Sequence, residues 1–150
     1  MNFVNLYELV LKKFDNISEI KRQYLLLLGQ LTTVSDMTNE HFFKNIKDIN
    51  SIGQIVVGIE SKSETIVCSG TIIIEPKIIH GGRPAGHIED IVVLEKWRNK
   101  GIAKELLEHL REIAIEKNCY KIILDCNERL VKFYEKSGFS KKGIQLVEYI

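Results

Sequence analysis

Two neighbouring segments, residues 86–93 (GHIEDIVV) and residues 98–103 (RNKGIA), decide the fold of this chain. The first has the composition of a strand, and the second is a polar turn that leads into an amphipathic helix. Backbone N–H groups at a helix start have no partner inside the helix, and the helix dipole favours negative charge there. Gly101 lets the backbone approach a phosphate, and the small Ala103 keeps the helix close to its strand. The turn therefore predicts a binding site for a phosphorylated cofactor.

The composition is that of an ordinary globular domain, with 45% hydrophobic and 27% charged residues in a chain of 150. We expect one domain over residues 1–150, because a chain of this length buries roughly 70% of its unfolded surface. The net charge of +1 gives no general attraction to nucleic acid. The chain start does not resemble a signal peptide, and no apolar run is long enough for a membrane span. We therefore expect a cytoplasmic protein without membrane or nucleic-acid partners.

The cysteines predict neither disulfides nor a metal site. Cys68, Cys119 and Cys126 form an odd set without CxxC spacing. We expect buried free thiols that pack beside strands, and no bound metal.

The order of helical and extended patterns predicts an α/β domain, more loosely α+β, with a mixed central sheet and about four flanking helices. The expected strands are residues 7–13, 54–60, 65–75, 88–94, 120–126 and 139–149. The polar residues 61–64 are expected to join the second and third of these strands as a β-hairpin. The expected helices are residues 19–28 with Ser18 as N-cap, 38–49, 101–117, and 128–137 closed by Gly138.

The turn at residues 98–103 and the later segment FYEKSGF at residues 133–139 resemble the GCN5-related N-acetyltransferase (GNAT) superfamily. Within that superfamily, residues 86–91 (GHIEDI) and 118–126 (NCYKIILDC) are similar to the glucosamine 6-phosphate N-acetyltransferases. Two further segments, residues 31–34 (LTTV) and 74–80 (IEPKIIH), resemble the acceptor-site segments of that family.

The resemblance implies a GNAT fold and transfer of acetyl from acetyl-CoA to the amine of D-glucosamine 6-phosphate, by direct attack in a ternary complex. The product would serve UDP-N-acetylglucosamine synthesis. The cofactor-binding residues that it implies are Ile91, Val92, Val93, Arg98, Asn99, Lys100, Gly101, Ile102, Ala103, Lys104, Tyr134 and Lys136. Pantetheine amides suit an open strand edge, and a pyrophosphate suits converging N–H groups.

The implied catalytic residues are Tyr134, Asp125 and Glu89. A phenol can protonate the coenzyme A thiolate as it leaves, and a carboxylate can take the proton of the attacking amine. Each also has a structural alternative, since Tyr134 can simply pack beside Phe133, and Asp125 can cap the following helix. The oxyanion would be met by a backbone N–H near Ile91.

The implied acceptor-binding residues are Thr32, Lys77, Ile78, Ile79, His80, Glu89, Asp90, Tyr120 and Lys121. In the family, Tyr120 and Lys121 reach across from a second subunit, so the resemblance implies a homodimer that exchanges its C-terminal strands. Two departures from the family pattern stand out. Leu130 occupies the place of an asparagine that bonds the pantetheine, and residues 148–150 (EYI) lack a phosphate-binding arginine.

Two other functions remain open on the sequence. A GNAT enzyme could act on a protein N-terminus or a lysine, which would require an open groove for a peptide. A non-catalytic acyl-CoA-binding module is the third possibility, and the presence of Tyr134 and Asp125 argues against it.

Overall fold

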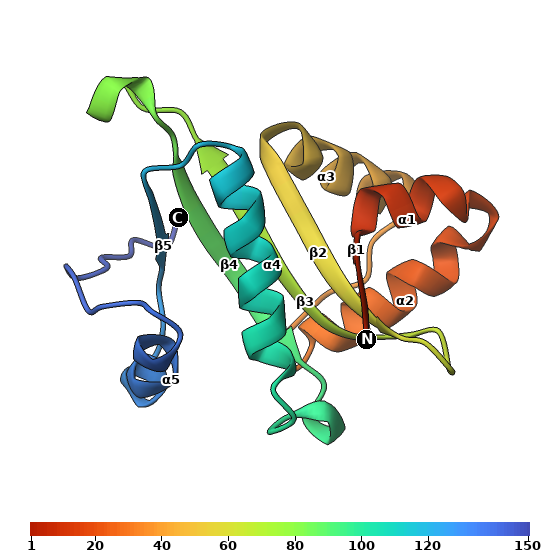
Figure 1. Cartoon of the computed structure of the whole chain (residues 1–150). Helices are drawn as coiled ribbons and strands as arrows, with labels where there is room; N and C mark the ends of the chain where they lie inside the picture. The colour runs from red at the N-terminus through yellow and green to blue at the C-terminus, as the bar shows by residue number, and fades with distance from the viewer.

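The computed structural model describes all 150 residues and is built on a five-stranded sheet of order β1-β2-β3-β4-β5 (Figure 1). Its strands are β1 (Asn2–Asn5), β2 (Gly53–Glu60), β3 (Thr65–Glu75), β4 (Ala85–Val93) and β5 (Lys121–Leu124). The first four strands pair antiparallel in sequence order, and β5 lies parallel to β4. The predicted mixed sheet and the hairpin at residues 54–75 are therefore confirmed.

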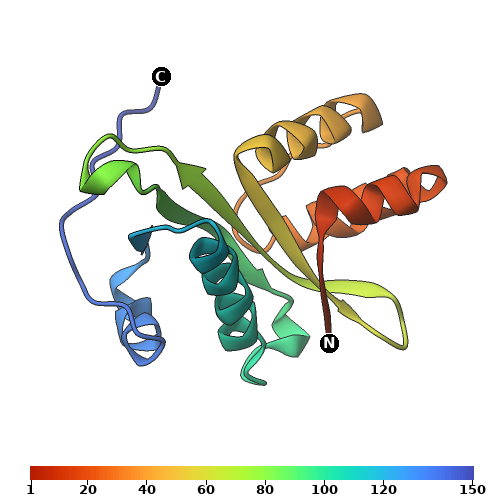
Figure 2. The ribbon, with the colours of Figure 1, turned by 45° about the horizontal axis from the view of Figure 1, so that its top comes forward.

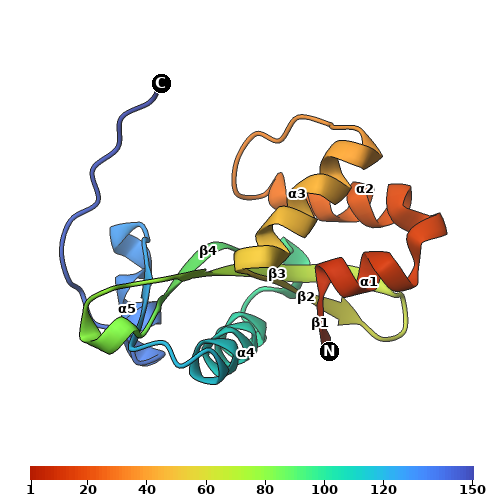
Figure 3. The same cartoon turned by 90° about the horizontal axis from the view of Figure 1, so that it is seen from above.

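Helices cover both faces of the sheet, as Figure 3 shows from above. On one face lie α1 (Leu6–Lys12), α2 (Ile17–Leu28) and α3 (Asn39–Ile52), and on the other lies α4 (Ile102–Glu116). The last helix, α5 (Val131–Lys136), packs in the same core as α4. None of these helices has the length and apolar character needed to cross a membrane.

Each face of the sheet has its own apolar core. The α1–α3 core contains Leu6, Val10, Leu27, Phe42 and Val57, while the α4 core contains Ile72, Ile88, Leu106, Leu110 and Tyr134. Side chains of a strand alternate between the faces, so the residues of β3 and β4 are divided between the two cores. This alternation determines which strand residues meet at the site.

The predicted strand at residues 7–13 is wrong, because most of this segment is the helix α1. Asn5 caps the helix by accepting a hydrogen bond from the Tyr7 N–H at 2.9 Å. Leu6 and Val10, four residues apart, are both fully buried, which is the spacing of one helix face. Tyr7, Leu9 and Leu11 alternate as in a strand, whereas Leu6 and Val10 are spaced as on a helix, so the two periods could not be told apart in the sequence.

The second helix starts slightly earlier than predicted, and the third is longer. Ser18 lies inside α2 rather than at its N-cap, and its hydroxyl instead accepts from Asn39 Nδ2 at 2.8 Å. Thr38 does cap α3, accepting from the His41 N–H at 3.1 Å. Gly29 ends α2 as predicted.

The predicted final strand, residues 139–149, is absent from the single chain. This segment has no regular structure and runs from α5 past the edge of the sheet to the C-terminus (Figure 2). Phe139 still packs against the α4 core, but Ile144 and Leu146 are each 91% exposed and have nothing to pack on. A strand gains its stability from a paired neighbour, and no strand of the same chain pairs with this segment.

The cysteines are free, but only one of them is buried. Cys68 is buried in the α4 core, Cys119 is half-buried and Cys126 is exposed. The prediction of buried packing is therefore wrong for Cys126, because β5 is an edge strand and the chain turns to solvent beyond it.

Candidate active site

The parallel strands β4 and β5 separate halfway along β4. Their pairing runs from Ala85 and Lys121 to Ile88 and Leu124, and stops there. Along residues 89–93, the edge of β4 that faces β5 therefore has no partner strand. An open edge of this kind offers N–H and C=O groups to an extended ligand with amides of its own.

A β-bulge shapes the same part of β4. Ser69 pairs with Val92 and Thr71 pairs with Glu89, so two residues of β4, Asp90 and Ile91, stand opposite one residue of β3. Asp90 has a φ of 53°, a left-handed conformation that few residues other than glycine adopt. Bulges re-aim backbone groups locally, and they are frequent beside active sites.

The turn after β4 carries a run of free backbone donors. The N–H groups of residues 99–103 donate to no acceptor in the chain, whereas the N–H groups of Lys104 and Glu105 donate to Gly101. Asn99 and Gly101 have φ angles of 60° and 83°, and such left-handed residues help successive N–H groups to converge. This geometry, at the start of the 15-residue helix α4, is suited to a pyrophosphate.

The side chains of the cofactor turn have different environments. Ile102 is buried, so only its backbone can meet a ligand, whereas Lys104 is exposed. Lys100 is exposed as well, and its Nζ lies 4.7 Å from the Trp97 ring centroid. Val92 and Val93 are also buried, which limits them to backbone contacts.

Arg98 is held by the protein on two sides. Its Nε donates to the Val93 carbonyl at 3.0 Å, and its Nη2 donates to Gln30 Oε1 at 3.2 Å. Gln30 also accepts from the Glu95 N–H at 3.0 Å. Sequence reasoning missed Gln30, since no local pattern shows that the end of α2 reaches the turn after β4.

Tyr134 packs beside Phe133, as its structural alternative predicts, and its catalytic role stays a prediction. It is 8% exposed and packs edge-to-face against Phe133 and Phe139, with ring centroids 5.0 Å and 5.9 Å away. It shares its core with Val93 and Ile102, the residues next to the open edge and the turn. Burial, and secondarily the charge of Cys126, raises the pKa of the Tyr134 phenol, which therefore stays protonated at neutral pH and can donate.

Polar side chains line the α1–α3 face of the sheet where those helices stop. The helices contact β2, β3 and part of β4, and the residues of β5 on this face are exposed. By strand alternation and register, this uncovered area carries Glu75, His87, Glu89, Lys121 and Asp125. The sheet thus brings together carboxylates that lie far apart in the sequence.

Glu89 is the carboxylate of this group whose pKa is raised. Burial raises its pKa, and the negative charges of Asp125 and Asp90 raise it further, while His87 opposes the shift. Asp125 is exposed, and its Oδ2 accepts from Gln145 Nε2 at 2.9 Å, so the C-terminal tail reaches the site. A carboxylate with a raised pKa is a better proton acceptor than an ordinary glutamate.

The predicted phosphate-binding residues lie mostly at the start of β5. The His80 ring stacks on Tyr120 with centroids 4.1 Å apart, and Lys121 Nζ lies 5.4 Å from the Tyr120 centroid. Lys77 pairs with Glu75, whose other oxygen contacts His87. Ile78 and Ile79 project into solvent from the same loop.

The fold does not place Thr32 beside the other predicted acceptor-binding residues at the start of β5. It follows α2 in the turn that begins at Gln30, near the far end of β4, whereas Lys121 pairs with the first residue of β4. The length of β4 separates these two positions by about 25 Å along the strand. One chain therefore cannot direct Thr32 and Lys121 at the same small phosphate.

A buried hydroxyl cluster that the sequence did not reveal lies beneath the bulge. Tyr24 on α2 lies beside Ser69 and Thr71 of β3, and all three side chains are buried. Burial raises the pKa of Tyr24 to about 12, and the two hydroxyls oppose part of the shift. Ser69 Oγ has no hydrogen-bond partner in the chain.

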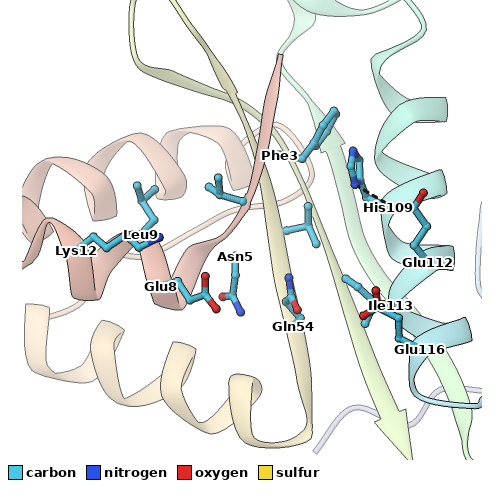
Figure 4. A pocket seen from close by; sticks show the side chains of 12 residues that line it. Phe3, Asn5, Glu8, Leu9, Lys12, Gln54, His109, Glu112, Ile113 and Glu116 are labelled. Atoms are coloured by element: carbon cyan, nitrogen blue, oxygen red, sulfur yellow. Dashed lines mark ion pairs between the residues drawn. The ribbon is translucent and has the colours of Figure 1, made fainter.

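A groove of about 330 Å³ lies at the opposite edge of the sheet, between β1, α1 and α4 (Figure 4). Phe3, Gln54 and His109 are among its lining residues, and Figure 4 shows Phe3 beside His109. No predicted site residue lines it. Because β1 and β5 are the two opposite edges of the sheet, this groove is separate from the site at β4 and β5.

Proteins with similar sequences are acetyltransferases, in keeping with a site suited to a phosphorylated cofactor. The sequence profile of the Acetyltransferase (GNAT) family matches residues 16–139. Glucosamine 6-phosphate N-acetyltransferase of Arabidopsis thaliana is 39% identical over 136 residues, which are 89% of this chain and 91% of the relative. The corresponding Trypanosoma brucei brucei enzyme is 42% identical over 118 residues, covering 77% of this chain and 80% of the relative.

A solved structure also matches along nearly the whole chain. The crystal structure of glucosamine-6-phosphate N-acetyltransferase from Arabidopsis thaliana superimposes with a TM-score of 0.86 at 35% identity, covering 99% of this chain and 97% of the other. Fold, open strand edge and sequence thus agree. The chain belongs to the GNAT family of acetyltransferases and, within it, to the glucosamine 6-phosphate N-acetyltransferases.

Proposed function

We propose that this protein transfers acetyl from acetyl-CoA to the amine of D-glucosamine 6-phosphate, giving N-acetyl-D-glucosamine 6-phosphate for UDP-N-acetylglucosamine synthesis. The observation that carries the proposal is the position of Glu89 and Asp125 at the fork of β4 and β5, beside the open edge of β4. The names of the most similar relatives support this acceptor.

The open edge and the donor-rich turn fit the two ends of a coenzyme A arm. Backbone groups of Ile91, Val92 and Val93 would bind the pantetheine amides as an added strand would. The free N–H groups of residues 99–103 would bind the pyrophosphate, and Lys104 in the first turn of α4 and Lys136 on α5, both exposed, would add positive charge. The thioester supplies an activated acyl group, so no metal is needed for the transfer.

The site residues divide the proton transfers between them. As the amine nitrogen bonds to the acyl carbon, Glu89 accepts the proton that the nitrogen loses, and Asp125 orients the amine. As the carbon–sulfur bond breaks, the Tyr134 phenol donates its proton to the sulfur. A backbone N–H of the bulge near Ile91 stabilises the charge on the acyl oxygen.

Binding of the sugar phosphate is assigned to two groups of residues. Glu89 and Asp90 would contact the sugar, and Lys121 with Tyr120, His80 and the loop at residues 77–79 would bind the phosphate. Because Thr32 and Lys121 are at opposite ends of β4, they can serve one phosphate only if two chains contribute.

This requirement supports a homodimer with exchanged C-terminal strands. The outer edge of β5 has no partner strand, and Ile144, Leu146 and Tyr149 are almost fully exposed in the tail. An exposed apolar segment and a bare strand edge are complementary features. The three free cysteines support a reducing compartment, in keeping with a cytoplasmic enzyme.

The acceptor is tested by incubating the purified protein with acetyl-CoA and glucosamine 6-phosphate and measuring the release of free coenzyme A thiol. We expect thiol release that depends on both substrates, together with the N-acetylated sugar phosphate by mass spectrometry. Glucosamine without phosphate, a peptide with a free N-terminus and a lysine peptide serve as comparison acceptors. Thiol release no higher than background, or faster turnover of a peptide amine, would reject this acceptor.

A further inference from the structure

One side chain, Gln30, joins the cofactor turn to the loop that follows α2. Its Oε1 accepts from the backbone N–H of Glu95 and from Nη2 of Arg98. A carboxamide oxygen has two lone pairs, so these donors satisfy it fully. Both donors belong to the turn between β4 and α4. Any rearrangement of that turn therefore acts directly on Gln30.

Arg98 connects Gln30 to the open edge of β4. Its Nε donates to the carbonyl of Val93, the last residue of β4, while its Nη2 is bonded to Gln30. The guanidinium group is planar and rigid, so these two contacts cannot adjust independently. The end of the open edge, the turn and Gln30 thus form one hydrogen-bonded chain.

Gln30 lies in a tight backbone turn at the start of the loop at residues 29–38. Its own N–H donates to Leu27, and the N–H groups of Leu31 and Thr32 both donate to Leu28, at 2.8 Å and 3.4 Å. The chain is therefore tightly wound from Gln30 to Thr32. Beyond this point, residues 33–38 belong to no helix or strand.

The far end of this loop is anchored to α2 instead. Lys21 Nζ lies 3.1 Å from Asp36 and also donates to the carbonyl of Met37. Between the two anchors, a groove of about 650 Å³ separates the loop from α2, lined by Leu26, Gln30 and Val34 among other residues. The loop is therefore held mainly at its two ends, and its first anchor is the contact of Gln30 with the turn between β4 and α4.

We propose that Gln30 is a positioning residue that couples the two substrate sites: occupation of the cofactor turn orders residues 31–36 for the acceptor. Coupling between sites is reciprocal, so acceptor binding through this loop strengthens cofactor binding by the same factor. The inference rests on the proposed function only in treating residues 31–34 as an acceptor segment.

Hydrogen exchange of the full-length protein tests the coupling without an acceptor. Coenzyme A binding should slow exchange of the amides at residues 31–36 by roughly 3- to 10-fold, in line with the worth of one or two hydrogen bonds. In Gln30→Ala this protection should be lost at saturating coenzyme A, while Gln30→Glu, which keeps both acceptor sites, should restore it. Fluorescence of Trp97, the only tryptophan and a member of the turn, verifies saturation.

Lys21→Met provides the matched control, because it frees the far anchor without touching the turn. It should speed exchange of the loop both with and without coenzyme A, and yet retain the coenzyme A-dependent protection. Equal protection of residues 31–36 in the wild type and Gln30→Ala would overturn the proposal, as would no protection in the wild type.

A second readout is the affinity of coenzyme A with and without glucosamine 6-phosphate, measured calorimetrically. The dissociation constant of coenzyme A without glucosamine 6-phosphate, divided by the constant with it, should exceed one in the wild type and approach one in Gln30→Ala. The same ratio in both proteins contradicts the coupling. If glucosamine 6-phosphate neither binds nor accepts acetyl, the proposed acceptor fails, whereas the exchange experiment still decides the role of Gln30.

Discussion

Glu89 and Asp125 occupy matching positions immediately after the last paired residues of β4 and β5, Ile88 and Leu124. By strand alternation they extend the face on which His87 stands opposite Ile123. Burial raises the pKa of Glu89, and the charge of Asp125 adds to the shift. The fork of the two strands thus places a pair of like charges where an incoming ammonium group would be attracted.

The pH dependence of turnover should report this pair. Activity requires ionised Glu89, so kcat/KM for the acceptor falls as pH decreases through the raised pKa, above the value of about 4.3 of a free glutamate. Asp125→Asn removes one like charge and should move this acidic limb to lower pH. Profiles of rate against pH at saturating acetyl-CoA measure the shift. If the acidic limb does not move, the charge of Asp125 does not influence the ionisation of Glu89 during turnover.

Glu89→Gln should slow the enzyme and stabilise the fold at the same time. Because the folded state raises the pKa of Glu89, its ionised form is disfavoured in the folded protein above that pKa, and stability increases as pH falls through it. Removing the charge should therefore raise the melting temperature at pH 7, while kcat falls by roughly 100-fold or more. A lower melting temperature would show that the Glu89 charge is stabilising.

Tyr134→Phe should lower kcat by roughly 100-fold with little change in acetyl-CoA affinity, since only the proton donor is removed. The ring would keep its edge-to-face contacts with Phe133 and Phe139, so the melting temperature should hardly change. Steady-state kinetics and calorimetry separate the two effects. Tyr7→Phe, on α1 beside Phe43, is the matched control and should retain full turnover. A wild-type kcat in Tyr134→Phe would remove this residue from catalysis.

Lys121→Glu should raise the KM for glucosamine 6-phosphate by roughly 10- to 100-fold, because a charged hydrogen bond to phosphate is lost and repulsion replaces it. The KM for acetyl-CoA should remain near its wild-type value. The same reversal at the exposed Lys47 of α3 controls for net charge. A change confined to the acetyl-CoA constant would contradict the acceptor assignment.

Gly101→Val should weaken coenzyme A binding by roughly 5- to 30-fold, because a left-handed conformation costs a residue with Cβ about 1–2 kcal/mol. No atom lies within 4 Å of the position that a Cβ would occupy, so the cost is conformational rather than steric. Gly101→Asn should lose less affinity, since asparagine tolerates positive φ. Equal losses of coenzyme A affinity in both variants would indicate instead that any side chain at position 101 clashes with the bound cofactor.

Removal of residues 144–150 should convert a dimer into a monomer without unfolding it. Those residues make one side-chain hydrogen bond to the rest of the chain, from Gln145 to Asp125. Light scattering after size exclusion measures the mass, and thermal melting controls for folding. A truncated protein that stays dimeric would exclude strand exchange through this tail.

Local sequence patterns were sufficient where one short-range signal dominated. Thr38 with the spaced Phe42 and Ile46 predicted α3, and the β-branched runs around the polar residues 61–64 predicted the hairpin. Residues 7–13 were misassigned because their apolar residues satisfy both periods, and tertiary packing of Leu6 and Val10 decided for a helix. The predicted strand at residues 139–149 failed because a strand is defined by a partner, which a single chain does not supply.

The sequence by itself determined the family, and it predicted the cofactor turn and the roles of Glu89, Asp125 and Tyr134, because each belongs to a contiguous motif. Only the tertiary structure decided that β4 and β5 separate just before the two carboxylates, and that Gln30 of one layer binds Arg98 of another. Such contacts depend on strand register and helix placement. These are set by the summed packing of two cores, and no local pattern encodes them.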